Sequence, residues 1–340
     1  MNFKEYIELH RNEVYSKICE YVKIKDPVEH YKMVRDYIDR QGSYRRPGLL
    51  MLSGEVFGAN KEDLITPAAA MQLSEDWILV HDDAEDDSEL RRGKPALHRM
   101  YGIEQAINVG DAGHAAMWRM VKDHLLSAGT EKGNRFYEKF YDMIEYTVEG
   151  QYIDTNFFVN VRDLKKASED LYFRIVESKT CYYSVYGPLQ LGAIVANADQ
   201  KTIGMLKDIG VPAGRAFQII DDVLDMTADE KLFGKKNYGD LYEGKLTLII
   251  LNTYKKATEA EKTRIDKIYK KRRKERTDEE VNFLIEVIDK YDSIEYAKSR
   301  AKAYGEEAKG IIEKYKNALP NNEYTEAMLS AVEELYMRKK

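Results

Sequence analysis

Few stretches of this chain alternate apolar and polar side chains, which is the pattern of a half-buried strand. Most of the chain instead consists of long stretches typical of helices, separated by short polar or glycine-containing breaks. Its 340 residues include only seven prolines, and Ala, Leu, Glu, Lys and Met are plentiful, which also favours helix. The pattern therefore predicts an all-α fold.

The two most informative predicted helices both end in acidic residues. A Thr-Pro pair at residues 66–67 places a capping hydroxyl before a proline at the first helical position. One helix is therefore expected to begin there and to end at about Asp83. The other is expected to run from about Asp199 or Val211 to about Asp225.

A third core helix is expected over residues 169–187, ended by the Gly-Pro pair at 187–188. The remaining punctuation consists of charged, glycine-bearing or proline-bearing segments, which are typical of loops. Loops or breaks are expected at residues 88–95, at residues 226–244, near Thr277 and at residues 320–322.

Composition and charge narrow the functional classes. The formal net charge is −6, so the chain lacks the basic field of a nucleic-acid-binding protein. The only cysteines, Cys19 and Cys181, supply neither a disulfide framework nor a thiolate-rich zinc site. We find no signal peptide, no run as long as a membrane span and no composition shift that marks a domain boundary. We therefore expect one cytoplasmic domain over residues 1–340, without an integral membrane segment or a nucleic-acid partner.

An acidic cluster directly follows the first of these helices. Residues 82–87 contain five carboxylates in six positions. On a helix, Asp82 and Asp86 lie one turn apart on one face, as do Asp83 and Asp87. Like charges at that spacing destabilise a helix by roughly 0.2–0.5 kcal/mol per pair. Bound cations would relieve this repulsion.

The pattern Asp-Asp-x-x-Asp occurs a second time, as Asp221, Asp222 and Asp225, embedded in apolar residues. Aspartates in such surroundings are seldom left unpaired. Oxygen ligands without His or Cys favour magnesium, manganese or calcium over zinc. Magnesium usually takes one or two protein carboxylates, and water and substrate phosphate complete its coordination. Two such clusters therefore predict a diphosphate held through metal ions.

Other interpretations of the clusters fit less well. Either cluster alone is equally compatible with a solvated acidic helix end. Neither has the ligand spacing of an EF-hand, and His81 forms no Glu-x-x-His pair of the kind that a di-iron bundle needs. What favours diphosphate binding is the order of basic residues around both clusters, because their side chains suit phosphate oxygens. These residues are Arg45, Arg46, Arg91, Arg92, Lys94, Lys179, Lys235, Lys236 and Lys245.

This ordered set resembles the trans-isoprenyl diphosphate synthase family, which includes the farnesyl and geranylgeranyl diphosphate synthases. The matching motifs occupy residues 45–47, 79–86, 91–95, 110–111, 150–154, 179–180, 217–225 and 234–247. The resemblance implies a single large helical bundle around a deep central cavity, usually as a homodimer. It also implies condensation of isopentenyl diphosphate with dimethylallyl, geranyl or farnesyl diphosphate to a short-chain all-trans prenyl diphosphate.

The resemblance further implies a role for each matching residue. Asp82, Asp86 and Asp221 would ligate magnesium, or manganese in its place, with about three ions on the substrate diphosphate. Catalytic or nearby roles would fall to Asp83, Asp222, Asp225, Asp154, Lys179, Gln151 and Gln218. The allylic diphosphate would be bound by Arg91, Lys179, Thr180, Gln218, Lys235 and Lys245. The isopentenyl diphosphate site would comprise Ser43, Arg45, Arg46, Glu75 and Arg92.

Two positions of the isopentenyl site depart from the family pattern. The family normally has Gly-Gly-Lys-x-x-Arg-Pro where residues 41–47 read Gln-Gly-Ser-Tyr-Arg-Arg-Pro, so Ser43 replaces a lysine. Seven residues before Asp82 the family usually has His or Gln, and this chain has Glu75. A carboxylate beside a diphosphate would repel it unless the carboxylate is paired or protonated.

Two explanations of these departures are open. In one, Arg45 and the basic tail at residues 338–340 compensate for the lost contacts. In the other, the nucleophile differs, or the chain is a weakened partner subunit. The arginines that remain, Arg46 and Arg92, favour compensation.

Product length is expected to depend on the helix before the first acidic cluster. Trp77 and Ile78 lie about one turn before Asp82, where family members set the floor of the chain cavity. A tryptophan there predicts a product of fifteen or twenty carbons, with twenty favoured. A plain core role for Trp77 is the alternative.

Two other functions are considered. A non-catalytic or weakly active prenyl-diphosphate-binding partner subunit would keep the acidic clusters without turnover. A terpene cyclase shares the fold, but the second metal motif of cyclases is usually of an Asn/Ser/Glu type. The second Asp-Asp-x-x-Asp therefore favours a chain-elongating synthase.

Overall fold

The computed structural model describes residues 2–227 and 238–336, and within these ranges it is almost entirely helical. The helices group into two compact units. Unit 1 comprises residues 1–144, 184–209 and 312–332, and unit 2 comprises residues 145–183, 210–311 and 333–340. The prediction of one domain over the whole chain stays a prediction.

The elements of unit 1 are seven α-helices, a short hairpin and a 3₁₀ turn. They are α1 (Phe3–Tyr21), α2 (Val28–Asp39), α3 (Arg45–Val56), α4 (Lys61–Glu85), β1 (Leu90–Arg91), β2 (Lys94–Pro95), α5 (Leu97–Tyr101), α6 (Ile103–Ala128), α9 (Gly187–Val195) and the 3₁₀ turn η5 (Lys316–Ala318). Five helices contribute residues to both units: α7 (Thr130–Asn156), the π-helix η3 (Val176–Tyr186), α10 (Gln200–Thr227), α16 (Ser293–Tyr315) and α17 (Glu323–Tyr336).

Unit 2 is built from shorter helices. They are the π-helix η1 (Phe157–Val161), the 3₁₀ turn η2 (Leu164–Lys166), α8 (Glu169–Ile175), α12 (Gly239–Glu243), α13 (Leu248–Lys256), α14 (Glu259–Tyr269), the 3₁₀ turn η4 (Arg273–Glu275) and α15 (Asp278–Lys290). The all-α prediction is confirmed, since β1 and β2 are the only strands in the part of the chain that the structure describes. Among the described helices, none is both long and apolar enough to cross a membrane.

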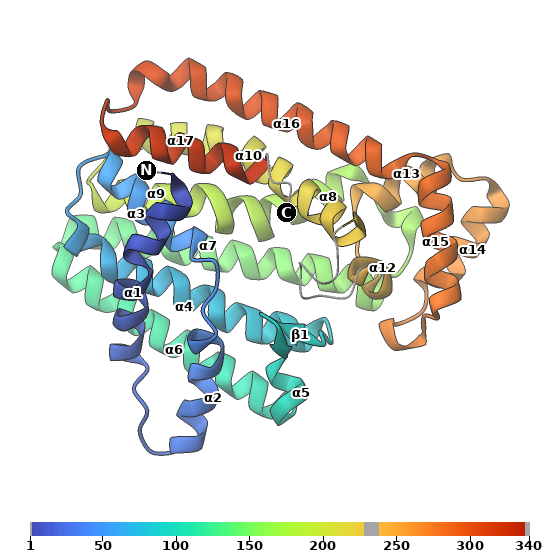
Figure 1. Ribbon diagram of the computed structural model, residues 1–340, viewed down its shortest axis with the longest axis horizontal. Helices are drawn as coiled ribbons and strands as arrows, with labels where there is room; N and C mark the ends of the chain where they lie inside the picture. The colour runs from blue at the N-terminus through green and yellow to red at the C-terminus, as the bar shows by residue number, and fades with distance from the viewer. Residues whose placement is uncertain (1, 228–237, 337–340) are drawn as a thin grey trace. The chain divides into compact units, whose positions relative to one another are not determined.

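The core of unit 1 forms around α4, which packs against α6, α3 and α1 (Figure 1). From Pro67 to Trp77 every residue of α4 is buried, so this helix is surrounded by protein along its middle. Helix α3 also packs on α9, and Gly192 permits their close approach because a Cβ there would overlap the backbone at Leu50. The buried middle of α4 is what positions its acidic carboxyl end.

The predicted start of this helix is wrong. Helix α4 begins at Lys61 after the N-cap Asn60, so Pro67 lies inside it. The acidic first turn suits the positive end of the helix dipole, and Leu64 is already fully buried. These contributions outweigh the single backbone hydrogen bond that Pro67 cannot donate.

Other predicted boundaries met mixed outcomes. The loop expected at 88–95 contains the β1–β2 hairpin, because Arg92 and Gly93 both adopt positive φ and make a two-residue turn. The helix expected over 169–187 changes from α8 to the wider η3 at Val176, and a new α-helix follows from Gly187 instead of a break. Proline suits the first positions of α9, where its missing N–H is not needed.

The remaining predicted boundaries are largely confirmed. Helix α10 starts at Gln200, next to the predicted Asp199. Thr277 caps α15 through a capping box, and residues 320–322 separate η5 from α17. The loop expected at 226–244 contains the short helix α12, while residues 228–237 lie outside the described residues.

Candidate active site

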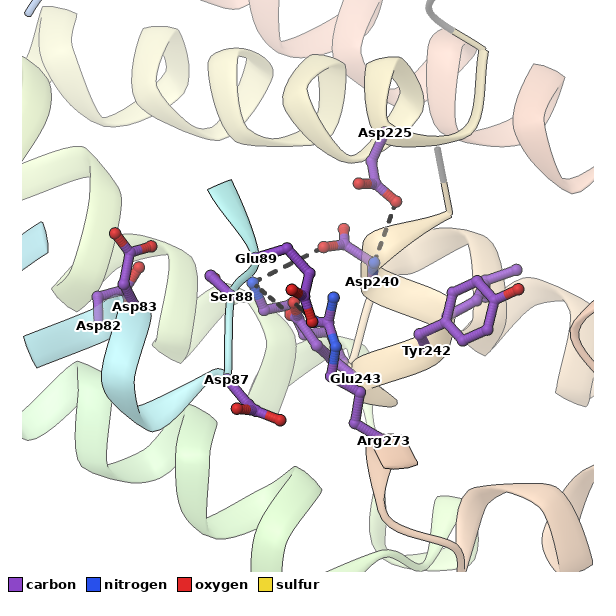
Figure 2. Close-up of polar contacts among 12 residues, drawn as sticks. Asp82, Asp83, Asp87, Ser88, Glu89, Asp225, Asp240, Tyr242, Glu243 and Arg273 are labelled. Carbon is purple, nitrogen blue, oxygen red and sulfur yellow. Dashed lines mark hydrogen bonds and ion pairs between the residues drawn. The ribbon is translucent and has the colours of Figure 1, made fainter. Parts of the chain in front are cut away.

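The first acidic cluster lies at the carboxyl end of α4, where Figure 2 shows Asp82 and Asp83 side by side. The helix ends at Glu85, and Asp86 is its C-cap. Asp87 adopts φ of +54°, so the expected helical pairing of Asp83 with Asp87 is wrong: the chain has already left the helix. Asp82 and Asp86 do keep their one-turn spacing, since the Asp86 N–H donates to the Asp82 carbonyl oxygen at 2.9 Å.

Asp83 is a structural anchor for the hairpin. Its carboxylate is fully buried and accepts three hydrogen bonds from the Arg91 guanidinium at 2.5–3.1 Å. It also accepts one from the Tyr37 hydroxyl at 2.6 Å, and burial together with this carboxylate raises the pKa of Tyr37. Arg91 lies 3.8 Å from Asp82 as well. The predicted diphosphate ligand Arg91 is thus held against both aspartates by its own hairpin.

The predicted isopentenyl site contains a cluster of opposite charges within unit 1. Nη1 of Arg46 lies 2.9 Å from Oε2 of Glu75, and Nη2 of Arg92 lies 3.5 Å from Oε1 of the same carboxylate. Nη2 of Arg92 also donates to Asp76 at 2.9 Å. Of the other predicted members, Ser43 is exposed and Arg45 is half-buried. The structure therefore brings Arg46, Glu75 and Arg92 together.

Asp76 belongs to this cluster, and the sequence interpretation missed it. Its side chain is buried and also accepts a hydrogen bond from Gln72 at 3.2 Å. Burial raises its pKa to about 7, although the neighbouring Arg92 opposes that rise. The signal that could have found Asp76 was an acid within the longest buried stretch of α4, next to Glu75.

This buried carboxyl predicts a pH-dependent stability. The folded-state pKa of Asp76, about 7, exceeds its unfolded value near 3.8. The contribution of Asp76 to the free energy of unfolding is therefore full below pH 3.8 and is lost as pH rises through 7. In urea titrations from pH 5 to 8, the wild type should lose roughly 3 kcal/mol relative to Asp76→Asn. A pH-independent difference between the two proteins would contradict this.

The second acidic cluster lines a pocket that lies wholly within unit 2 and has a volume of about 120 Å³. The pocket combines carboxylates, two lysines and an apolar wall. Its lining consists of Asp154, Tyr172, Ile175, Val176, Lys179, Thr180, Gln218, Asp221, Asp222, Asp225, Asp240, Lys245, Leu246 and Thr247. Most residues of the predicted allylic site and all three aspartates of the second motif therefore line the same pocket, and Asp154 lines it as well.

The three aspartates of the second motif have different environments. Asp222 is buried and accepts hydrogen bonds from the Tyr172 hydroxyl at 2.7 Å and from Gln218 at 2.9 Å. Burial raises the pKa of Asp222 to about 7. Asp221, one residue earlier on α10, is exposed. The helix therefore directs one carboxylate of the motif to the pocket surface and the next into the protein.

Asp225, the third aspartate, contacts the start of α12. Figure 2 shows its carboxylate directed at the start of α12, where it accepts a hydrogen bond from the Asp240 N–H at 3.1 Å. Burial raises the pKa of Asp240, and the nearby Asp225 adds to that rise. The chain continues to Lys245, which lies 3.0 Å from Glu243 and 3.7 Å from Asp240.

Lys179 and Thr180 reach the same pocket from η3. The Lys179 ammonium lies 2.9 Å from the Asp154 carboxylate, and the two side chains form an ion pair in the pocket. The Thr180 hydroxyl donates to Gln218 at 2.7 Å, and Gln218 in turn donates to Asp222. A hydroxyl, an amide and a carboxylate thus form one chain of hydrogen bonds along the pocket.

Arg276 was also missed, and it anchors the loop that carries Lys245. This buried guanidinium donates all five of its N–H groups to backbone carbonyl oxygens at 2.5–3.3 Å. Two of these acceptors, Leu241 and Tyr242, close the end of α12. Gly244 has φ of +81°, and a Cβ there would overlap Arg276. No sequence motif predicts such a contact between a guanidinium and the backbone of a distant loop.

The pocket suits a magnesium ion by its ligand chemistry. Among the residues that the structure describes, five carboxylates line it, and no histidine or cysteine does. In the described residues no group of three or more His, Cys, Asp or Glu side chains is preassembled around one point. Magnesium does not need such a cage, because it binds one or two carboxylates and takes the rest from water and phosphate. The predicted ligands Asp82, Asp86 and Asp221 stay a prediction.

The other predicted residues have these positions. Gln151 is half-buried on α7. Trp77 is buried, and its indole N–H donates to the sulfur of Met117 on α6 at 3.2 Å, while Ile78 is half-buried. Lys235 lies outside the described residues, as do Lys236 and the tail at 338–340.

Comparisons with known proteins agree over almost the whole chain. The family model for polyprenyl synthetase matches residues 28–288. A geranylgeranyl diphosphate synthase of Methanosarcina mazei is 32% identical over 313 residues, which is 91% of each chain. One of Saccharolobus solfataricus is 34% identical over 268 residues, 78% of this chain and 77% of its own.

Solved structures give the same answer. The crystal structure of geranylgeranyl pyrophosphate synthetase from Pyrococcus horikoshii superposes with a TM-score of 0.85 and is 31% identical. It matches 99% of this chain and 98% of its own. With the ordered motifs and the aspartate pocket, these similarities show that the chain belongs to the polyprenyl synthetase family.

Proposed function

We propose that this member of the polyprenyl synthetase family condenses isopentenyl diphosphate with an allylic diphosphate, and that its main product is the twenty-carbon all-trans diphosphate. The observation that carries the proposal is the unit 2 pocket, where an Asp-Asp-x-x-Asp motif meets Lys179 and Lys245. Relatives at 32% and 34% identity that are named geranylgeranyl diphosphate synthases support the product length.

The residues of the pocket suit cleavage of an allylic carbon–oxygen bond. As that bond breaks, negative charge grows on the leaving diphosphate and positive charge on the allylic carbon. Lys179 and Lys245 supply fixed positive charge for the former, and such preorganised charge stabilises the transition state. The alkene of isopentenyl diphosphate then bonds to the allylic carbon, and loss of a proton to the released diphosphate restores an alkene. No protein nucleophile is required.

Magnesium belongs to this proposal as the resident metal, with manganese as a substitute. When bound, it neutralises charge on the diphosphate and orients it. Asp221 is the exposed carboxylate of the second motif and suits that task, together with Asp82 and Asp86 from the first. The buried Asp222 and Asp225, which contacts α12, position their neighbours.

The deciding experiment is an assay of the purified chain with magnesium, isopentenyl diphosphate and each allylic primer in turn. We expect prenyl diphosphate products that, after dephosphorylation, are sized as twenty-carbon alcohols. Absence of turnover with every primer would indicate a binding subunit, and a hydrocarbon product would indicate a cyclase. Omitting magnesium or adding a chelator should abolish turnover.

Product length is expected to depend on Trp77. Trp77→Ala should lengthen the main product by at least one five-carbon unit if this side chain closes the chain cavity. Sizing the products of this variant and of Trp118→Ala makes the comparison, because Trp118 is the only other tryptophan and lies half-buried on α6. Truncating a buried tryptophan costs about 3–5 kcal/mol, so assays should run well below the melting temperature. Unchanged product length would assign Trp77 to the core alone.

A homodimer is part of the proposal as well. Two large apolar side chains one turn apart on α6, Ile103 and Ile107, are 50% and 48% exposed. Exposed apolar side chains that gather on one helix are typical of an interaction surface. A second copy of this chain is the partner that we propose.

A further inference from the structure

The charged cluster of unit 1 consists of Arg46, Glu75, Asp76 and Arg92. The Glu75 carboxylate lies at the position where the diphosphate of the substrate is expected. The two oxygens of Glu75 are divided between two arginines: Oε2 lies near Arg46 and Oε1 near Arg92. The arginines come from different elements, α3 and the β1–β2 turn, and converge on this one side chain. Two guanidinium groups around one bidentate anion is the arrangement that binds a phosphate or a carboxylate.

Asp76 and Glu75 play different parts in this cluster. Asp76 is 3% exposed, and Gln72 donates to the same Asp76 oxygen that accepts from Arg92. Arg92 also donates to the Tyr37 carbonyl oxygen at 2.5 Å. One side of Arg92 is thus fixed inside the protein. Glu75 contacts both Arg92 and Arg46. The Arg46 guanidinium also donates to the Ser184 hydroxyl at 2.8 and 3.1 Å.

The charges of the cluster nearly cancel. Arg46 and Arg92 contribute two positive charges, and Glu75 and Asp76 contribute up to two negative ones. A diphosphate that binds these arginines must therefore compete with Glu75, since two anions cannot share the same donors without repulsion. The arginine side chains remain 24% and 14% exposed, so a ligand can reach them.

We propose that Glu75 is a specificity-determining residue of the isopentenyl diphosphate site. Its carboxylate occupies the position between Arg46 and Arg92 where the diphosphate of that substrate would bind, so the substrate binds only by displacing it. This inference rests on the proposed function, because that function assigns Arg46 and Arg92 to isopentenyl diphosphate. Under this inference, Glu75 weakens the isopentenyl diphosphate site without removing it. The consequence is a high KM for isopentenyl diphosphate beside an ordinary KM for the allylic substrate.

The test is a gain of affinity, which a damaged fold does not produce. Glu75→Gln keeps the shape of the side chain and removes its charge. At saturating geranyl diphosphate, we expect its KM for isopentenyl diphosphate to fall at least about tenfold, which corresponds to roughly 1.4 kcal/mol. Its KM for geranyl diphosphate should stay within about twofold. Glu62→Gln, an exposed glutamate in the first turn of the same helix, is the matched control and should change neither.

Calorimetric titration of isopentenyl diphosphate separates this inference from the proposed function. The titration reads affinity without turnover, and Glu75→Gln should bind at least about tenfold more tightly than the wild type. An equal or weaker affinity, or an unchanged KM in a folded Glu75→Gln protein, would overturn the inference while leaving prenyl transfer in place. Tighter binding without product from any variant would support the inference and contradict the proposed function.

Discussion

Replacing Asp221 with asparagine is expected to lower kcat by about 10³-fold with little change in thermal stability. Asp221 is the exposed carboxylate of the second aspartate motif and lines the unit 2 pocket with Lys179 and Lys245. Asparagine keeps the side-chain shape but removes the negative charge that a divalent cation needs. Because the side chain is exposed, few packing contacts are lost.

The measurement is steady-state prenyl transfer over a range of magnesium concentrations, with melting temperatures recorded in parallel. The half-saturating magnesium concentration should rise together with the fall in kcat. Asp208→Asn is the control, because Asp208 is an exposed aspartate of the same helix α10 and does not line the pocket. Full activity of Asp221→Asn at ordinary magnesium would remove this carboxylate from the metal site.

A large loss of stability is expected from Asp83→Ala. Asp83 is fully buried between the Arg91 guanidinium and the Tyr37 hydroxyl. Removing it leaves a guanidinium, 14% exposed, without its main carboxylate and a buried hydroxyl without its acceptor. Breaking a buried ion pair in this way costs about 3–5 kcal/mol. The hairpin that carries Arg91 and Arg92 should lose order at the same time.

Asp39, Arg35 and Tyr15 form a similar Asp-Arg-Tyr group at the protein surface, and it serves as a matched control. Asp39 accepts hydrogen bonds from Arg35 at 2.7 Å and from the Tyr15 hydroxyl at 2.9 Å, but its side chain is 49% exposed. Asp39→Ala should cost no more than about 1 kcal/mol, because water replaces the lost partner. Urea unfolding of both variants makes the comparison. Equal losses would show that Asp83 contributes no more than a surface pair.

Much of the candidate site could be predicted from the sequence, because many of its residues occur in short motifs with regular spacing. The repeated Asp-Asp-x-x-Asp places carboxylates one helical turn apart whatever surrounds the helix. Asp221, Asp222, Asp225 and Lys179 were predicted from the residues themselves, and Thr180 and Gln218 from the family resemblance; all six line one pocket. The all-α class followed in the same way from composition and from the scarcity of alternating stretches.

What failed depended on contacts between distant parts of the chain. The start of α4 was wrong because burial of Leu64 and the cap at Asn60 outweigh the proline signal at Pro67. The partners Tyr172 and Arg276 were missed, since their hydrogen bonds join residues 50 and 35 positions apart.

By itself, the sequence determined which residue types are present and how they are spaced along each helix: two aspartate motifs, their flanking cations and an acid at position 75. Only the tertiary structure decided which of those charges are neutralised. It placed Asp83 against Arg91, and Glu75 between Arg46 and Arg92. The physical reason is that helical periodicity is a local property, whereas burial and pairing of a charge depend on side chains that packing brings from elsewhere in the chain.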